Sequence, residues 1–281
     1  MSGVATAAKP LARQPQPQIP GRDALARLGP PIIGLAAGAL LWEVLGRVWA
    51  VSFFPPLSEV LVRLSELTAE GRIVENLVGS LTNLFIGYGI AATVGVTVGV
   101  LMGAYRRVEM ALDVYVYAML TAPSLVFAPI FFAVFGLKQI QLTILSIIIL
   151  YSIWIIIVNT TAAIRMVPTP LIEMGRSMCA SERQLFFKII LPAATPLIFA
   201  GLRLAMGRAV KGMINGEMFI IAIGLGGVVI SAGRRFDAAA VLAVLLVIIV
   251  VALLMVKLVQ LVDAQMTGWL PSTARQTRSR S

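Results

Sequence analysis

The side chains with the clearest chemical capacity lie together in an apolar stretch late in the chain. Arg203, Arg208 and Lys211 place three cations near one acid, Glu217, among residues that are otherwise mostly apolar. Ionisable groups at membrane depth usually face a cavity or a charged partner. Arg208, Lys211 and Asn215 share one helical face, which suits the passage of a small anion. Ion pairing between helices, with long side chains reaching outward, is the alternative interpretation.

Other chemistry is excluded by what the sequence lacks. It contains no histidine, which removes histidine-based metal sites, nucleophilic sites and proton relays. Its single cysteine, Cys179, allows no internal disulfide and no cysteine-rich zinc site. No Walker-type phosphate-binding motif is present, so we do not expect this chain to hydrolyse ATP. The net charge of +10 is better explained by membrane topology than by nucleic acid binding.

A second candidate region is the proline-rich segment LTAPSLVFAPIFFAVFG. Pro123 and Pro129 each remove a helix hydrogen bond, and freed backbone groups are tolerated in a membrane only where protein or water satisfies them. We therefore predict a kinked wall of a translocation pathway, with a packing kink as the alternative. The polar and aromatic side chains expected along this wall are Ser124, Phe127, Phe131 and Phe135.

A polar segment at 165–192, RMVPTPLIEMGRSMCASERQLFFKIILP, carries orderly local signals. Pro168 and Pro170 favour the start of a short helix. Ser181 and Gln184 have the spacing of a capping box for a second helix. The pattern predicts a short helix across one end of a bundle, with its charges available to a soluble partner. A plain surface connection is the alternative.

Membrane-spanning helices must position these segments. Hydrophobic residues make up 59% and charged residues 13% of the sequence, whereas a soluble domain has about 25% charged residues. A spanning helix needs roughly 20 apolar residues. Six stretches fit: Ile32–Phe54, Asn76–Tyr105, Val114–Leu137, Gln139–Ile164, Leu197–Ile223 and Ala238–Val256. Because backbone polar groups in lipid must be satisfied internally, we predict an all-α bundle of six transmembrane helices.

The basic residues predict how the bundle is oriented. The side that holds both termini and the loop 165–192 carries fourteen Lys and Arg, against five on the other side. The positive-inside rule therefore places both termini in the cytoplasm. We expect residues 1–30 to be a disordered cytoplasmic tail rather than a signal peptide. Residues 31–265 would form the transmembrane domain and 266–281 a cytoplasmic C-terminal tail.

Three local patterns predict contacts within the bundle. Small residues recur at every fourth position, which lets another helix approach closely; they are Gly87, Ala91, Gly95, Gly99 and Gly103. Glu43 and Arg47 lie one turn apart and predict an ion pair. The segment 55–75 is amphipathic, which indicates an interfacial helix or a dock for an external protein.

The loop 165–192 resembles the EAA loop of ABC importer permeases, in which E-A-A-x-x-x-G is followed by I-x-L-P. Here the run is Glu173-Met174-Gly175, then Cys179 at the glycine position, and Ile189-Ile190-Leu191-Pro192 completes it. The flanking stretches FFPPLSEVL, NTTAAIRMVPTPLIE and GRSMCASERQLFFKIILPAATPLIFAGLRLAMGRA are similar to the nitrate/sulfonate/taurine branch, over residues 55–265. Met174, Gly175 and Cys179 depart from the pattern. Cys179 stands where the family has a glycine, which allows the bend between the two short helices. A non-glycine residue at the positive φ of such a bend is uncommon.

This resemblance implies a type I importer permease-like bundle in the bacterial inner membrane. It implies a coupling helix seated in a partner ATPase, which would bind the ATP and Mg²⁺; the chain itself would hold no cofactor or metal. The residues carried over to this contact are Glu173, Met174, Gly175, Arg176, Met178, Cys179, Ala180, Ser181, Arg183, Leu191 and Pro192.

The other partners that the resemblance implies are a second permease copy and an external solute-binding protein. Membrane lipid surrounds the bundle, and no nucleic acid is expected. The implied substrate is a small anion such as a sulfonate, taurine or nitrate, moved inward by alternating access. A stand-alone carrier driven by an ion gradient and a non-transporting membrane scaffold are the alternatives. A carrier predicts paired repeats and broken helices in matching halves, whereas the proline breaks here lie in one half only.

Overall fold

The computed structural model describes residues 22–49, 51, 53–220 and 224–266, and its regular structure in these ranges is entirely helical. The long helices are α1 (Arg22–Trp49), α3 (Arg72–Ala104), α6 (Ile140–Arg165), α9 (Leu191–Ile220) and α11 (Ala238–Met266). The shorter α-helices are α2 (Leu57–Ala69), α4 (Arg106–Thr121), α5 (Ala128–Phe135), α7 (Thr169–Ser177), α8 (Glu182–Leu185) and α10 (Gly224–Arg234). Two 3₁₀ turns, η1 (Ser124–Phe127) and η2 (Leu137–Gln139), and a π-helical turn, η3 (Phe186–Ile190), complete the path.

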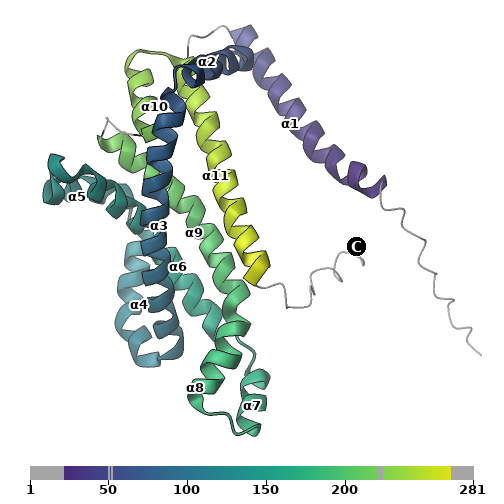
Figure 1. Cartoon of the computed structure of the whole chain (residues 1–281), viewed down its shortest axis with the longest axis vertical. Helices are drawn as coiled ribbons and strands as arrows, with labels where there is room; N and C mark the ends of the chain where they lie inside the picture. The colour runs from purple at the N-terminus through teal and green to yellow at the C-terminus, as the bar shows by residue number, and fades with distance from the viewer. Residues whose placement is uncertain (1–21, 50, 52, 221–223, 267–281) are drawn as a thin grey trace, which may run out of the picture.

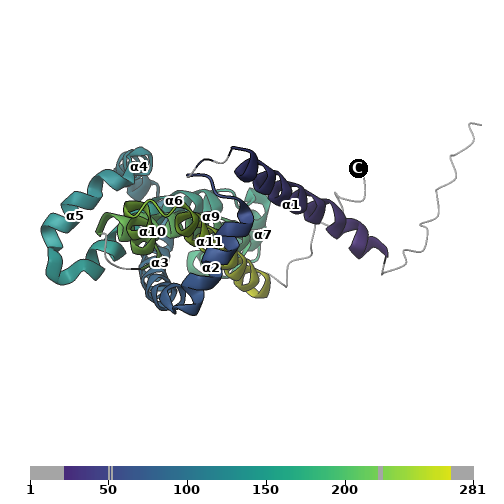
Figure 2. The same ribbon diagram turned by 90° about the horizontal axis from the view of Figure 1, so that it is seen from above.

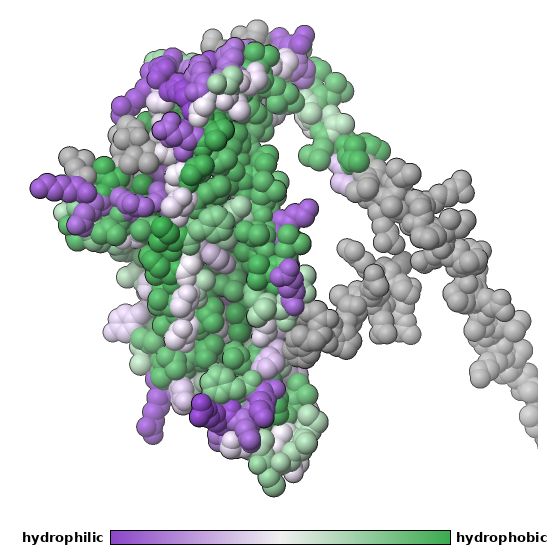
Figure 3. Space-filling view, viewed as in Figure 1, coloured by the Kyte–Doolittle hydropathy of each residue, from purple (hydrophilic) through white to green (hydrophobic). Residues whose placement is uncertain are grey.

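Five of the described helices are long and apolar enough to cross a membrane, and a bent pair makes a sixth candidate. Apolar side chains cover most of the visible middle of the bundle, and hydrophilic ones gather at its two ends, with a few on the arm that carries α5 and at the edge near α11 (Figure 3). The predicted all-α membrane bundle is therefore confirmed. Helix α1 begins at Arg22, ahead of the boundary expected at residue 31, and Ile223 lies outside the described residues.

The third predicted span, Val114–Leu137, is not one kinked helix. Helix α4 begins at Arg106 and ends at Thr121, and the segment Ser124–Phe135 continues at 96° to it. Pro123 precedes η1 and Pro129 lies in the first turn of α5, where proline is well tolerated. The prolines therefore start new helical segments at a sharp break.

The predicted small-residue face of α3 is confirmed, and its partner is α6. A β-carbon added to Gly87 would lie 2.8 Å from Ile148, and one added to Gly95 would lie 2.9 Å from Ile156. The same close approach joins Gly99 to Thr160 and Gly103 to Ile164. Because these pairs advance together along both helices, α3 and α6 are parallel. The bent α4–α5 segment must therefore return the chain to its starting side, which supports its role as one crossing.

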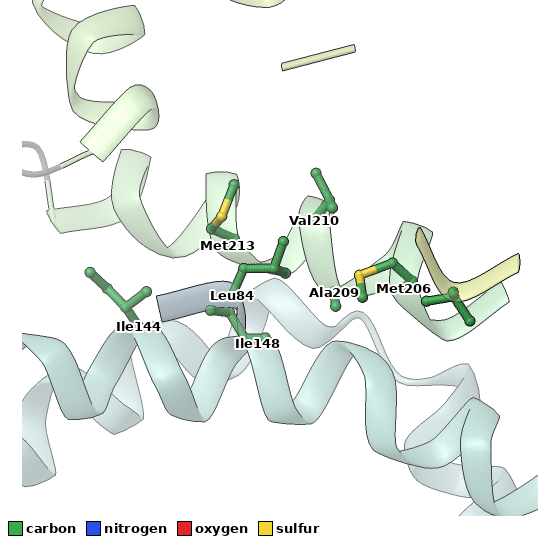
Figure 4. Packing of buried hydrophobic residues seen from close by; sticks show 8 residues of the cluster. Leu84, Ile144, Ile148, Met206, Ala209, Val210 and Met213 are labelled. Carbon is green, nitrogen blue, oxygen red and sulfur yellow. The ribbon is translucent and has the colours of Figure 1, made fainter. Parts of the chain in front are cut away.

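Helix α9 packs antiparallel on the neighbouring side of α6. Gly212 lies against Tyr151 and Gly216 against Ile144, so the sequence numbers run in opposite directions along this contact. Between these helices and α3 lies a buried cluster that includes Leu84, Ile148 and Met213 (Figure 4). Burying a large apolar side chain contributes about 2 kcal/mol. The core thus fixes α3, α6 and α9 as one unit.

The end of the bundle opposite α7 and α8 is closed by α2 and α10 (Figure 1). Arg63 of α2 donates to Asp237 at the start of α11, at 2.9 Å, and forms an ion pair with Glu66. These two hydrogen bonds raise the pKa of the Arg63 guanidinium above its ordinary value. The segment predicted to be amphipathic is helical in α2, with Val60 and Leu67 buried.

Helix α1 leans away from the other long helices in both views (Figures 1 and 2). Its predicted pair is confirmed, since Arg47 lies 2.6 Å from the carboxylate of Glu43. That carboxylate also accepts hydrogen bonds from the backbone N–H and the hydroxyl of Ser58, each at 2.9 Å. Glu43 therefore ties α1 to the first turn of α2.

Candidate functional site

The loop between α6 and α9 folds as a compact helical hairpin at one end of the bundle (Figure 1). Helix α7 begins after Pro168 and has Pro170 in its first turn, as the sequence predicts. The capping box is confirmed: the Ser181 hydroxyl accepts from the Gln184 backbone, and the Ser181 N–H donates to the Gln184 side chain at 2.9 Å. Helix α8 then continues through η3 into α9, which starts at Leu191-Pro192.

The outer side of α7 is open. Met174 is 52% exposed and Met178 is 77% exposed, although both are large apolar residues. Glu173, Arg176 and Ser181 are also exposed, and Arg176 lies 3.6 Å from Glu182. Flexible methionine side chains are frequent on surfaces that bind partners. The predicted anchors and polar contacts thus share one accessible end of the molecule, where Arg183 is exposed and Ala180 is partly exposed.

The inner side of α7 is fixed by Gly175, which is buried. A β-carbon at this position would lie 2.5 Å from both the Leu185 and the Ile189 side chains. Glycine therefore lets α7 rest directly on the segment that leads into α9. The departure from alanine at this position allows a closer approach between α7 and the segment that leads into α9.

The chain reverses at Cys179, whose φ of 55° lies in the left-handed region. The Cys179 N–H donates to the Arg176 carbonyl at 2.9 Å, and the Ala180 N–H donates to the Gly175 carbonyl at 3.1 Å. This pair of bonds is the Schellman arrangement, whose left-handed position is usually glycine. The bend for which a glycine is expected is therefore present here, but the backbone of Cys179 is strained in this left-handed conformation.

We expect Cys179→Gly to stabilise the chain by about 1 kcal/mol, because glycine removes the left-handed penalty of a side chain. Cys179→Ala is the matched control, since it loses the same thiol but keeps the β-carbon. The midpoint of denaturant unfolding in detergent measures both. Equal midpoints for the two variants would show that the bend carries no strain.

The cationic face of α9 forms the second candidate site. Arg208 and Lys211 are exposed, and within the described part of the chain neither forms an ion pair. Asn215, on the same face, donates to the Tyr151 hydroxyl of α6 at 2.8 Å. Charged side chains in a span are costly against lipid. This face therefore borders water or another protein, and Tyr151 is a member that the sequence did not single out.

Arg203 and Glu217 lie elsewhere on α9 and have structural contacts. Arg203 forms an ion pair with Asp263 of α11 at 2.7 Å. Glu217 is fully buried and accepts a hydrogen bond from the Gly226 N–H at 3.0 Å, while Ser80 accepts from Leu225. The Glu217 carboxylate and the Ser80 hydroxyl therefore cap the first turn of α10. A β-carbon on Gly224 would overlap the Glu217 carboxylate, so glycine is required there.

The proline-rich segment lies on a separate arm of the molecule (Figure 2). Ser124, Phe127, Phe131 and Phe135 are partly buried, and Pro123 and Pro129 are exposed. The arm reaches α9 through Phe132, whose ring meets Phe219 edge-on at 6.3 Å. Among the described residues, no hydrogen bond or ion pair joins this segment to Arg208 or Lys211. The two halves of the predicted pathway are joined by the contact between Phe132 and Phe219.

The structure thus combines a membrane bundle with a helical hairpin at one end and exposed cations on one face of α9. The profile of the family "Binding-protein-dependent transport system inner membrane component" matches residues 95–268, and the chain belongs to this family. It is 31% identical over 205 residues to the bicarbonate transport system permease protein CmpB of Synechocystis sp., covering 69% of this chain and 72% of that protein.

Further relatives belong to the same branch. The nitrate import permease protein NrtB of Synechocystis sp. is 35% identical over 147 residues, covering 52% of this chain and 53% of that protein. A Bacillus subtilis protein named for aliphatic sulfonates transport is 29% identical over 231 residues, covering 82% and 83%. The resemblance to nitrate and sulfonate permeases is thus confirmed, and the chain is a permease subunit of an ABC importer rather than a stand-alone carrier.

Solved structures agree on the fold. The MetNI methionine ABC transporter, in an inward-facing conformation, matches with a TM-score of 0.58 at 19% identity. The match covers 69% of this chain and 96% of the MetNI chain.

Proposed function

We propose that this chain moves a small anion inward through the bacterial inner membrane, powered by ATP hydrolysis in a separate subunit that docks on α7. The observation that carries this proposal is the exposed face of α7 at the tip of a rigid hairpin. The chain itself performs no covalent chemistry and binds no cofactor. The ATP and its Mg²⁺ belong to the partner ATPase.

Energy transfer depends on the rigidity of the hairpin. Met174 and Met178 supply apolar anchors for a groove in the ATPase, and Glu173 and Arg176 supply polar contacts. Gly175 holds α7 against Leu185 and Ile189, which belong to the path into α9. A displacement of α7 is therefore passed to the spanning helix, as expected when a packed element moves as a unit.

The substrate is a small anion of the bicarbonate, nitrate or sulfonate type. The named relatives support this class, and Arg208 and Lys211 support it by their positive charge. Two exposed cations attract an anion, yet their limited number allows its release. Because charged side chains avoid lipid, the face that carries them is placed along the pathway, where a second copy of the chain completes the wall.

The assembly has a defined orientation. The end with α7 and α8 faces the cytoplasm, together with both termini, because it carries the larger share of Lys and Arg. The opposite end, closed by α2 and α10, then receives the external solute-binding protein. Arg234 and Arg235 are exposed there and are available to acidic groups on that partner.

Gentle detergent purification of the tagged full-length chain tests the assignment. We expect an ATPase subunit with a Walker motif to be recovered in equal amount. Repeated recovery of a folded permease without any ATPase would refute the proposed assembly.

We expect Lys211→Met to slow uptake of an anionic substrate by about tenfold, because one cation near an anion in a partly dehydrated site contributes roughly 1–2 kcal/mol. The comparison variant Lys138→Met removes a cation from the turn between α5 and α6, away from the α9 face. Uptake of labelled nitrate, bicarbonate and taurine into vesicles is the measurement. Unchanged rates and substrate preference in Lys211→Met would assign this side chain a structural role.

A further inference from the structure

A cavity of about 680 Å³ opens beside the hairpin, between the turn from α3 to α4 and the loop that follows α6. Its walls include Gly103 and Ala104, the last residues of α3, and Ile164 and Arg165, the last residues of α6. Two spanning helices end here, so the cavity lies at the level where the bundle leaves the membrane. Lipid headgroups occupy this level.

One wall of the cavity offers an available cation. Arg165 lines the cavity but is paired with Glu109. Arg183 also lines it, is exposed, and its side chain forms no hydrogen bond or ion pair with any residue that the structure describes. Glu182 lies on the same wall, but its side chain is 84% exposed and its carboxylate is paired with Arg176. Arg183 is therefore free to bind an anion.

The same segment that carries Arg183 also lines the cavity with apolar side chains. Phe186 and Phe187 both line the cavity from η3, and their rings meet edge-on at 5.2 Å. Phe187 is 57% exposed, and Ile172 and Ile190 extend the apolar surface. The π-helical turn places these two rings, and such turns are frequent at functional sites. A free guanidinium beside an apolar wall at a membrane surface fits an amphiphilic anion.

We propose that this cavity binds an anionic phospholipid of the adjacent leaflet. Its phosphate accepts charge-assisted hydrogen bonds from Arg183, and the first carbons of its acyl chains cover Phe186 and Phe187. The lipid would then lie between the α3–α4 turn and the hairpin that carries α7. This site is additional to the transport pathway, and it assigns to lipid the side chain of Arg183, which the family resemblance places at the ATPase contact.

The test is native mass spectrometry of the full-length chain released from bilayers of equal parts phosphatidylglycerol and phosphatidylcholine. We expect selective retention of phosphatidylglycerol, and about a fivefold loss in Arg183→Gln, the factor for one cation near an anionic surface. Arg183→Lys retains the charge and should keep most of the lipid. Arg235→Gln, which removes an exposed cation from the opposite end, should leave retention unchanged. Phe187→Ala should weaken retention without changing the charge.

Three results would overturn the proposal. The first is equal retention of the two lipids by the unmodified chain. The second is displacement of the lipid by millimolar inorganic phosphate, which would identify a site for free anions. The third is a loss of co-purified ATPase in Arg183→Gln with lipid retention intact, which would assign the cavity to the protein partner. Recovery of the ATPase with the unmodified chain is a separate readout, so failure of the lipid site and failure of the importer assembly can be distinguished.

Discussion

Replacing Glu173 with lysine is expected to abolish ATP-driven uptake while the permease remains folded. Glu173 is exposed on α7, and its backbone carbonyl, rather than its carboxylate, accepts the hydrogen bond from Ser177. The fold therefore loses little. In the proposed contact, however, the change opposes a cation to a groove that accepts an acid. Reversing a charge in an interface costs about 3 kcal/mol, or roughly a hundredfold in affinity.

The measurement has two readouts, the amount of ATPase recovered per permease and the uptake of substrate into vesicles. Glu59→Lys is the matched control, because it reverses an exposed acid on α2 at the other end of the bundle. We expect this variant to retain its ATPase. If Glu173→Lys kept both the ATPase and the uptake, α7 would not be the coupling helix.

The second large effect is expected at Gly99, where one added methyl group should separate α3 from α6. A β-carbon there would lie 2.6 Å from Thr160 and 2.8 Å from the Ile157 carbonyl, and the backbone oxygen cannot move aside. Overpacking of this kind costs about 1–3 kcal/mol. Gly99→Ala should lower the free energy of unfolding by this amount.

Gly89→Ala provides a control on the same helix. A β-carbon at Gly89 has no neighbour within 4 Å, so we expect a neutral or stabilising effect of up to about 1 kcal/mol from the better helix propensity. Reversible unfolding in mixed detergent measures both variants. Equal destabilisation by the two changes would mean that the close α3–α6 approach does not limit stability.

Much of this fold could be predicted because its determinants are local. The long apolar runs locate the spans, since a helix in lipid needs a continuous apolar length. The spacing of Ser181 and Gln184 identified a helix start that the structure contains. The small residues of α3 predicted a close partner, although the pattern could not name α6, because the complementary residues are ordinary large apolar ones.

The parts that could not be predicted depend on distant residues. Pro123 signals a lost hydrogen bond but not the direction of the 96° bend. Helix α10 was missed because its glycine-rich start has a low helix propensity. It is held by Ser80 of α3 and Glu217 of α9, which lie far away in the sequence.

The candidate sites show the same division. The loop 165–192 is one continuous segment, so its accessible face followed from local spacing. The cationic face of α9 could be drawn on a helix, but the enclosure of Glu217 beneath α10 could not. A charge pattern along a single helix does not reveal which neighbour covers each residue. The roles of Arg208, Lys211 and the proline-rich arm in translocation stay predictions.

The contact between α3 and α6 also works as a track with evenly spaced positions. Its small residues recur every four positions, and the residues they meet on α6, such as Ile156, Thr160 and Ile164, follow the same spacing. A slide of four residues, about 6 Å, would again place small residues opposite this row of side chains. What selects one position is the set of contacts that do not repeat, such as Thr161 to the Gly99 carbonyl and Gln141 to Asn83. These polar contacts therefore add to the buried cluster around Leu84, Ile148 and Met213 in holding α3 and α6 at one register.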